Sequence, residues 1–488
     1  MVIESLKYKI LQQFGFAPTQ EQGQALDTFV SFLTDRDPQA VMILRGSAGT
    51  GKTSLSGAIV RTLLQIRQKV MLLAPTGRAA KVFSLGSGAP AYTIHRRIYR
   101  EKAFAGVDGQ FSLNDNLYTD TLFMVDEASM IANMGLGGTT FGSGCLLDDL
   151  VKFVYQGHND RLLLIGDKAQ LPPVGEEESP ALSASVMEEY GLKVYECDLN
   201  EVLRQSQSSG ILYNATLIRQ MITHDAVTGL PLIRFKGFAD IVMMPGAELV
   251  ESLGDSYHHV GMDETMVITR SNKRANIYNN GIRNMVLDRE EELSSGDMLM
   301  IVKNNYFWTE KEKKESGEES AGAVPAFLAN GDRAKVLRVS NYIELYGFRF
   351  ATLLLQLPDY DDYEMQVTGM LDTLQSEAPA LTHEQQEELF RQVEEDYQHF
   401  VPLKADRMKS IRQDAYFNAL QIKYAYAVTC HKAQGGQWAH VYVDQGYMTD
   451  DMLTPDYIHW LYTAFTRATD KLFLVNWPKE QTCEPTDL

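Results

Sequence analysis

Residues Gly46 to Thr53 read GSAGTGKT, which is a G-x-x-x-x-G-K-[ST] phosphate-binding loop. The apolar run VMIL (Val41 to Leu44) precedes the loop, and the helix-like stretch SLSGAIVRTLLQ follows it. In such a context the glycines let backbone N–H groups face phosphate oxygens, and the helix N-terminus adds a positive dipole. The sequence therefore predicts a nucleotide site rather than a chance glycine-rich turn. Its predicted residues are Gly46, Ser47, Ala48, Gly49, Thr50, Gly51, Lys52 and Thr53.

Two carboxylates are predicted to complete this site. Lys52 can reach the β- and γ-phosphates, and the Thr53 hydroxyl can bind Mg²⁺. Asp126 and Glu127 end another apolar run, LFMV, where Asp126 can hold Mg²⁺ through water and Glu127 can polarise the attacking water. The alternative is a helix-capping pair, since Asp-Glu-Ala-Ser is a good helix start. Beside a phosphate loop we favour ATP hydrolysis with Mg²⁺.

Short apolar runs predict an α/β fold. In the first 200 residues they alternate with helix-like stretches, and near-continuous apolar strands of this kind indicate a buried parallel sheet. These runs are VMIL (41–44), VMLLA (70–74), LFMV (122–125) and RLLLI (161–165). Strand–helix–strand repetition implies right-handed crossovers. A second set of runs predicts a second α/β domain that begins near Glu201 and closes the chain. That set is TMVIT (265–269), KYAYAVT (423–429), HVYV (440–443) and KLFLV (471–475).

An inserted domain interrupts the second set. A charged loop, EKEKKESGEES, is followed by NGDRAKVLRV and IELYGFRFATLLLQL, which are typical of β-hairpin or small-barrel strands. The acidic helix-like stretch THEQQEELFRQVEEDYQHF comes next. We expect a first α/β domain at 1–200 with a hairpin insert at about 99–117, a second domain at 201–298 and 420–488, and the inserted barrel and acidic helical domain at 299–419.

Composition limits the possible settings of the chain. No segment approaches the ~20 apolar residues of a membrane span, and MVIESLKYKILQQFGF lacks a signal-peptide layout. Four scattered cysteines indicate neither a metal site nor a disulfide framework, which fits a reducing cytoplasm. The net charge of −19 argues mildly against nucleic acid. However, Arg61 to Lys102 carries nine Lys/Arg and one acid, whereas Pro358 to Asp396 carries twelve acids and one base. The basic stretch is either a solvated helix face or an attractive surface for DNA.

Seven segments, in order, resemble superfamily 1 helicases of the RecD and Dda type, from Pro18 to Leu472. They are PTQEQGQAL, APTGRAAK, TIH, IGDKAQLPPV, LNEVLRQ, AYAVTCHKAQGGQW and LYTAFTRATDKL. The family's Gly-Asp-x-x-Gln-Leu-Pro-Pro signature distinguishes this chain from UvrD and Rep, which carry Gln-Ser-x-Tyr there. The resemblance implies two RecA-like P-loop domains, a small β-hairpin insert in the first and a barrel insert in the second. It also implies 5′-to-3′ movement on DNA.

The resemblance assigns roles residue by residue. It implies that Gln22 contacts adenine, that Gln170 senses the γ-phosphate, and that Arg204 and Arg467 stabilise charge on it. For either arginine in isolation, a surface ion pair is the alternative. The strand-contacting residues that it implies are Thr76, His95, Thr429, His431 and Lys432. For His95 and His431, a purely structural role stays equally open.

A hairpin is predicted between Arg100 and Leu117. Asp108-Gly109 is a tight-turn signal, with Phe104 and Phe111 on the two arms. At the matching place the family has a pin that splits the duplex, and the alternative is that both phenylalanines pack inward.

We therefore expect an ATP-dependent 5′-to-3′ DNA helicase that acts as a monomer on single-stranded DNA and duplex junctions, away from membranes. A motor subunit that unwinds poorly outside a larger complex, and an RNA-directed helicase of the same fold, stay open as alternatives.

Overall fold

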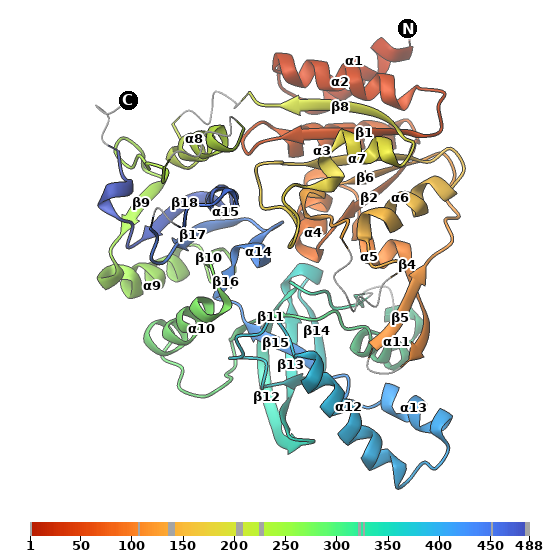
Figure 1. Ribbon diagram of the computed structural model, residues 1–488, viewed down its shortest axis with the longest axis vertical. Coiled ribbons are helices and arrows are strands. Elements are labelled where there is room, and N and C mark those ends of the chain that lie inside the picture. Colours follow the sequence, from red (N-terminus) through yellow and green to blue (C-terminus); the bar gives the residue numbers. More distant parts are fainter. Residues whose placement is uncertain are drawn as a thin grey trace. The chain divides into compact units, whose positions relative to one another are not determined.

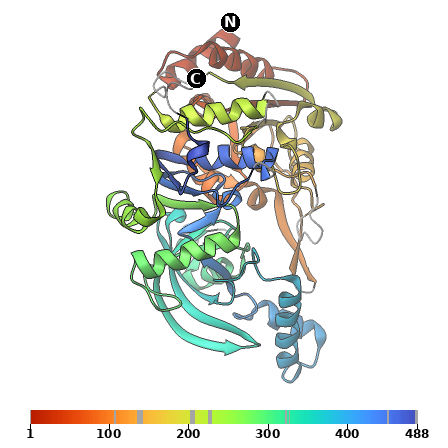
Figure 2. The same ribbon diagram turned by 60° about the vertical axis from the view of Figure 1, so that its left-hand side comes forward.

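The computed structural model describes residues 2–105, 108–134, 142–201, 208–223, 229–320, 324–325, 327–449 and 452–483. The chain forms two compact units (Figures 1 and 2). The first unit comprises Met1–Ala103, Gln110–Gly246 and Ala433–Leu488, and the second comprises Phe104–Gly109 and Ala247–Lys432. In the described part of the chain, no helix is long and apolar enough to cross a membrane.

The first unit is built on a six-stranded parallel sheet with the order β3-β2-β6-β7-β1-β8 (Figure 1). The strands are β1 (Ala40–Gly46), β2 (Lys69–Ala74), β3 (Ala91–Thr93), β6 (Thr121–Val125), β7 (Arg161–Gly166) and β8 (Lys193–Leu199). Helices lie between them in the sequence: α3 (Lys52–Gln65), α4 (Gly77–Ser87), α5 (Ile94–Ile98), α6 (Leu146–Gln156) and α7 (Ala184–Glu189). Before β1 come α1 (Val2–Phe14) and α2 (Gln20–Leu33).

Alternate residues of the central strands supply two separate cores. Met42 and Leu44 of β1 belong to a buried cluster with α1, α2 and α3, whereas Val41 and Ile43 belong to another with α5 and α6. Because successive side chains of a strand point to opposite faces, helices must cover both sides of this sheet. This is the doubly wound arrangement that the apolar runs predicted, and the predicted α/β fold class is confirmed.

All four predicted runs of the first sheet are strands, but two strands were missed. β8 pairs with β1 along seven residues, yet its burial alternates between exposed and partly buried positions. An edge strand of this kind, KVYECDL, has no continuous apolar run to reveal it. β3 has only three residues, which is too short for a pattern.

The strands of the second α/β set are divided between the units. In the first unit β17 (Trp438–Asp444), β18 (Ala468–Val475) and β9 (Ile241–Met244) pair in parallel. Here α8 (Gly210–Thr223) packs against α15 (Pro455–Phe465). In the second unit β10 (Thr265–Thr269) pairs in parallel with β16 (Ala427–Thr429).

The predicted run KYAYAVT is two strands, not one. Lys423 and Tyr424 end β15 (Leu420–Tyr424), whereas β16 begins at Ala427. The two strands have different partners, since β15 pairs with β11 and β16 with β10. Composition cannot reveal such a change of sheet, because both segments are equally apolar and buried.

The inserted part of the second unit contains a closed barrel with the order β11-β12-β13-β14-β15. Its strands are β11 (Met298–Ile301), β12 (Arg333–Leu345), β13 (Phe348–Leu357), β14 (Tyr363–Met370) and β15. The long β12–β13 pair is the predicted hairpin and forms the teal ribbon in Figure 2. β14 and β15 pair in parallel, and the other neighbours pair antiparallel.

Helices accompany the barrel. The acidic stretch forms α12 (His383–Gln398), which begins with a capping box between Thr382 and Gln385, and α13 (Lys404–Arg412) follows it. The charged segment that was predicted as a loop lies in a helix, α11 (Phe307–Ser320). Long charged residues have high helix propensity, and Trp308 anchors the first turn because its indole N–H donates to the Asn418 carbonyl. The remaining helices of the second unit are α9 (Leu249–His259), α10 (Asn272–Gly281) and α14 (Cys430–Ala433).

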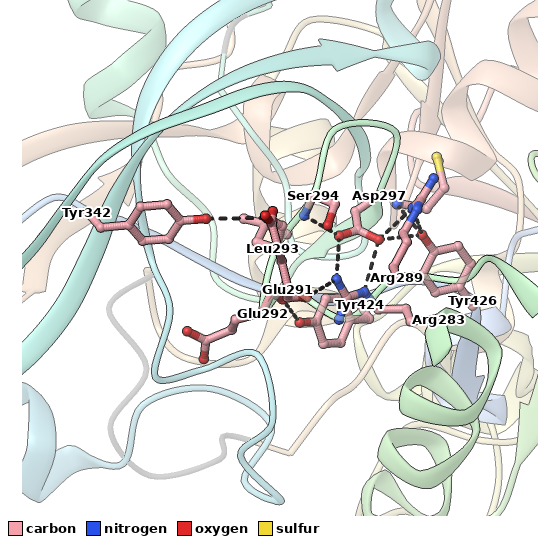
Figure 3. A network of polar contacts seen from close by, with 11 residues as sticks. Arg283, Arg289, Glu291, Glu292, Leu293, Ser294, Asp297, Tyr342, Tyr424 and Tyr426 are labelled. Atoms are coloured by element: carbon pink, nitrogen blue, oxygen red, sulfur yellow. Dashed lines mark hydrogen bonds and ion pairs between the residues drawn. The ribbon is translucent and has the colours of Figure 1, made fainter. Parts of the chain in front are cut away.

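A buried charged network ties the barrel to the segment after α10 (Figure 3). Asp297, fully buried just before β11, accepts two hydrogen bonds of 3.0 Å from Arg283 and one of 2.6 Å from Arg289. The Tyr426 hydroxyl donates to the same carboxylate at 2.8 Å. Arg283 lies in a π-helical turn (Ile282–Val286) and stacks over the Tyr424 ring at 4.6 Å. One carboxylate therefore joins three segments of the second unit.

Candidate nucleotide site

The phosphate loop joins β1 to α3 within the first unit, as its sequence predicted. A Cβ atom at Gly46 would lie 2.9 Å from both Lys52 Cγ and Thr50 Oγ1, so only glycine fits this close approach. Gly51 caps α3 with a φ of 83°, a conformation that glycine adopts without strain. The Lys52 ammonium group donates to the carbonyls of Gly46 and Ser47, so it already lies over the loop. Thr53 is exposed in the first turn of α3.

Gln22 supports the loop from α2. Its Nε2 donates to the Thr50 carbonyl at 2.9 Å, while its Oε1 accepts from the Thr19 backbone at 3.0 Å. The side chain is 1% exposed. Gln22 is thus both a helix cap and a support for the loop, and its predicted contact with adenine stays a prediction.

Asp126 and Glu127 follow β6 beside the phosphate loop. Burial and the neighbouring Glu127 carboxylate raise the Asp126 pKa to about 7, against the lowering effect of the Lys52 charge. Glu127 occupies the cap position of a 3₁₀ turn (Ala128–Met130) with a φ of 52°, yet its side chain makes no capping hydrogen bond. The Asp126 carboxylate accepts from the adjacent Glu127 amide at 2.9 Å. Glu127 therefore does not act as a side-chain cap, and the catalytic roles of the pair stay predictions.

The loop after β7 is tied to α15 through a buried tyrosine. The Tyr462 hydroxyl donates to Asp167 Oδ2 at 2.6 Å and accepts from the Ala48 amide, a phosphate-loop N–H, at 3.0 Å. Leu171 N donates to Thr463 Oγ1 at 2.8 Å. The side chain of Gln434 donates in turn to the Leu171 carbonyl at 2.7 Å. The Gly-Asp-x-x-Gln-Leu-Pro-Pro segment is therefore linked both to the phosphate loop and to residues near the C-terminal end.

Gln170, the predicted γ-phosphate sensor, lies in this segment and is 5% exposed. Its Oε1 atom is buried and has no hydrogen-bond partner among the described residues. Buried polar atoms are nearly always partnered, so this acceptor fits a site that binds a further polar group. The residues present thus fit a nucleotide with Mg²⁺, for which Thr53 and Asp126 are the candidate ligands. Groups of three or more His, Cys, Asp or Glu that could hold a metal are absent from the described residues, and Mg²⁺ bound with phosphates needs only one or two carboxylates.

Three arginines are candidates for contact with the nucleotide at this site. Arg467 is 2% exposed and donates to the Thr463 and Gly436 carbonyls and to Thr466 Oγ1, so its donors are used within its own neighbourhood. Arg204 lies outside the described residues. Arg219 of α8, which no quoted motif contains, donates to Ser47 Oγ at 2.7 Å. The roles predicted for Arg204 and Arg467 stay predictions, and Arg219 was missed by sequence reasoning.

Thr76 and His95 lie in the first unit. Thr76 caps α4, since its Oγ1 accepts from the Ala79 amide at 3.2 Å. A Cβ atom at Gly435 would lie 3.1 Å from the same Oγ1, so the APTGRAAK and HKAQGG segments meet here. His95 is half-buried, and burial lowers its pKa to about 4. Burial therefore favours the neutral form of His95 in the free protein.

Thr429, His431 and Lys432 lie together in the second unit, at the end of β16 and in α14. The Lys432 ammonium group donates to Asn330 Oδ1. Burial, and then the nearby Lys423 charge, lower the Lys432 pKa to about 8. In the free protein the Lys432 ammonium group therefore loses its proton more readily than that of an ordinary lysine. A nearby phosphate would favour the charged form.

The predicted hairpin is present as β4 (Tyr99–Ala105) and β5 (Asp108–Leu113). Asp108 and Gly109 belong to β5, so the prediction that they form the turn is wrong; residues 106–107 lie outside the described part. Phe111 is partly buried and packs against the core that contains α5 and α6, as the inward-packing alternative predicted. The side chain of Phe104 lies outside the described residues.

Comparisons with known proteins identify related families. Residues 17–229 match the model of an AAA domain, and residues 424–475 match that of the UvrD-like helicase C-terminal domain. The chain is 30% identical over 157 residues to the RecD2 DNA helicase of Deinococcus radiodurans and 25% identical over 267 residues to the Dda DNA helicase of Enterobacteria phage T4. This chain belongs to the superfamily 1 helicases of the RecD and Dda type.

Coverage differs among the relatives of this superfamily 1 chain. The matched parts cover 32% of the chain and 18% of RecD2, and 53% of the chain and 55% of Dda. An uncharacterised protein of Methanocaldococcus jannaschii is 33% identical over 32% of the chain, which spans only 13% of that protein. Among solved structures, a Bacteroides Pif1 helicase in complex with ADP-AlF3 and single-stranded DNA is 13% identical, with a TM-score of 0.47 and coverage of 96% and 95% of the two chains.

Proposed function

We propose that this chain is an ATP-driven DNA helicase that moves 5′ to 3′ on single-stranded DNA and separates duplex at a junction. The observation that carries the proposal is the link from the phosphate loop to α15. Tyr462 contacts a loop amide and Asp167 together, so a change at the phosphates alters a contact with the C-terminal α/β part. A motor needs such a link, whereas a simple phosphatase does not.

The chain's own residues suggest how hydrolysis proceeds. Lys52 leaves the loop carbonyls for phosphate oxygens, and Glu127 accepts the proton of the attacking water. Mg²⁺, when bound near Thr53 and Asp126, neutralises phosphate charge. An arginine such as Arg467 must leave its present partners to reach the γ-phosphate, so its approach requires rearrangement. Arginine fingers contribute on the order of 10³ to 10⁵ in rate.

The direction of movement is the finer part of the proposal. ATP-driven closure only alternates two modes of binding the strand, and this alternation does not by itself fix a direction. The support for the direction is therefore the likeness of APTGRAAK, GDKAQLPPV and TCHKAQGG to the RecD and Dda branch. The test offers duplexes with a 5′ tail, a 3′ tail or blunt ends, together with ATP and Mg²⁺. We expect separation only of the 5′-tailed duplex. Separation from the 3′ tail would refute the direction while leaving the ATPase proposal intact.

Two variants and one competitor complete the experiment. Lys52→Ala should abolish separation because it loses productive nucleotide binding, and Glu127→Gln should bind ATP and retain it unhydrolysed. Near-normal turnover in Glu127→Gln would contradict its assignment as the base. Strand-stimulated hydrolysis without separation would favour a motor subunit, and stronger stimulation by RNA than by DNA would favour an RNA-directed enzyme.

A further inference from the structure

Arg219 is a positive charge at the phosphate loop that no motif explains. It lies near the C-terminal end of α8, and its Nη1 donates to Ser47 Oγ at 2.7 Å and to Asn200 Oδ1 at 3.3 Å. Ser47 is the first residue after β1 and belongs to the loop that faces phosphate oxygens. The guanidinium group is therefore in direct contact with a residue of the phosphate loop.

The partners of Arg219 do not match its charge. Ser47 and Asn200 are neutral acceptors, and its Nε is buried with no hydrogen-bond partner among the described residues. The chain is rich in acids, with 64 Asp and Glu, and Arg283, for comparison, is held by a carboxylate. A planar guanidinium with a spare buried donor suits an anion with several oxygens, such as a phosphate group.

The described contacts of Arg467 leave this role open. Arg467 uses its donors on Thr463, Thr466 and Gly436, away from the loop. Arg219, by contrast, already donates to a residue of the phosphate loop. α8 packs against α15, which carries Tyr462. Arg219 and Tyr462 therefore approach neighbouring residues of the loop, Ser47 and Ala48, from adjacent helices.

We propose that Arg219 is a further nucleotide-contacting residue that binds the terminal phosphate of ATP and so distinguishes ATP from ADP. This inference rests on the proposed ATP-driven function. Arg219 exchanges the neutral Ser47 hydroxyl for a phosphate oxygen when ATP binds. The position of Arg219 therefore depends on whether the third phosphate is present. Because α8 carries Arg219 and packs against α15, this difference reaches both helices.

The test measures nucleotide affinity in the full chain. A fluorescent ADP is displaced by ADP or by a non-hydrolysable ATP analogue, each with Mg²⁺, so that hydrolysis plays no part. Arg219→Ala should weaken binding of the ATP analogue about ten- to hundredfold, as expected for a lost charge-assisted hydrogen bond, and should change ADP affinity by less than about threefold. Arg219→Lys should bind the ATP analogue with an affinity between those of the wild type and Arg219→Ala, because it keeps the charge but loses the planar guanidinium group with its several N–H donors.

Two matched variants separate recognition from a structural role. Asn200→Ala removes the other hydrogen bond of Arg219 but keeps the guanidinium group, so the ratio of ATP-analogue to ADP affinity should stay near that of the wild type. Gln220→Ala, an exposed neighbour on α8, controls for disturbance of the helix.

The inference is overturned if Arg219→Ala weakens both nucleotides equally, changes neither, or is matched by Asn200→Ala, because Arg219 would then only have a structural role or play no part. A wild-type chain that binds no nucleotide would overturn the proposed function as well. Equal melting temperatures for the variants establish that folding is not the cause, and Arg219→Gln serves as a second variant if Arg219→Ala melts early.

Discussion

At the residue scale, Asp332 is a buried acid whose protonation is tied to folding. It is fully buried just before β12, and Oδ2 accepts from the Tyr360 hydroxyl at 2.6 Å and the Ala329 amide at 2.7 Å. Oδ1 is buried with no partner among the described residues. Burial, assisted by the Asp359 charge, raises the Asp332 pKa from 3.8 to about 7. The folded protein therefore holds a neutral carboxyl group over much of the acidic range.

The sign of the pH dependence follows from this raised pKa. Between about pH 4 and 7 the unfolded chain has released this proton and the folded chain retains it, so Asp332 lowers stability as pH rises and the loss is complete above pH 7. At ~1.4 kcal/mol per pKa unit, the loss is at most on the order of 4 kcal/mol. Asp332→Asn imitates the neutral form and cannot ionise. It should melt somewhat above wild type at pH 5 and by a clearly larger margin above wild type at pH 8.

Scanning calorimetry at pH 5 and pH 8 checks this prediction. Glu364→Gln, on an exposed position of β14, is the matched control and should leave the difference between the two pH values unchanged. A melting difference between wild type and Asp332→Asn that is the same at both pH values would mean that Asp332 does not titrate in this range.

Sequence reasoning could propose those candidate residues of the site that belong to a local motif. Lys52, Thr53 and Glu127 could be found because their chemistry requires a fixed spacing within a loop or at the end of a strand. Arg219 could not be found, because its relation to Ser47 spans 172 positions and depends on how α8 packs. Tyr462 stood inside a quoted motif, but nothing in the motif shows that its hydroxyl meets Ala48.

At the element scale, the Asp297 network (Arg283, Arg289, Asp297, Tyr424 and Tyr426) holds the π-helical turn against the barrel (Figure 3). Asp297→Ala would leave two arginines without their shared carboxylate. Breaking a buried ion pair by removing one partner typically costs about 3 to 5 kcal/mol. We expect Asp297→Ala to lower the melting temperature clearly and to speed proteolysis of the second unit.

The control for this network is Glu344→Gln, an exposed carboxylate on the barrel strand β12. It should melt and digest like wild type. If Asp297→Ala behaved like this control, the network would contribute no net stability, and the desolvation of its charges would offset their attraction.

The β4–β5 hairpin offers a matched pair of phenylalanines. Phe111 packs against the first unit's core, so Phe111→Ala should lower stability while leaving duplex separation per folded molecule unchanged. Phe104 is the remaining candidate for a pin, so Phe104→Ala should reduce separation of a 5′-tailed duplex and keep strand-stimulated ATP hydrolysis. Parallel loss of both activities in Phe104→Ala would show that this arm is part of the motor and not a pin.

Elements were predictable where burial on both faces produced long apolar runs, as in β1, β2, β6 and β7. They were not predictable where pairing depended on distant partners. β8 is an edge strand with polar alternation, and the change of sheet between β15 and β16 occurs within one apolar segment. α11 is a charged helix whose anchor, the Trp308 contact with Asn418, comes from 110 residues further along the chain.

At the scale of the whole molecule, the net charge of −19 opposes DNA binding unless the charge is separated in space. Twelve acids lie between Pro358 and Asp396, a segment that the structure places in β14, α12 and their connections. The basic stretch from Arg61 to Lys102 lies in the first unit. Part of that stretch is structural, since Arg61 donates to the Gly86 carbonyl and Arg100 pairs with Asp115. The number of free cations is thus smaller than the sequence count, and the salt dependence should be correspondingly modest.

The affinity for single-stranded DNA should therefore fall with salt, with a slope of log K against log salt of ~0.7 per neutralised phosphate. Lys432→Gln tests one such contact. If the Lys432 ammonium group exchanges Asn330 for a phosphate, the variant should lose about 0.7 from the slope and bind more weakly at low salt. Lys409→Gln, an exposed lysine on α13, should leave the slope unchanged.

Because the Lys432 pKa is about 8, binding by the wild type should also weaken between pH 7 and 9 more than binding by Lys432→Gln. Fluorescence anisotropy of a labelled oligonucleotide at several salt concentrations measures all three effects. A flat wild-type titration would contradict phosphate binding altogether, whereas an unchanged slope in Lys432→Gln would remove this lysine alone from the contact.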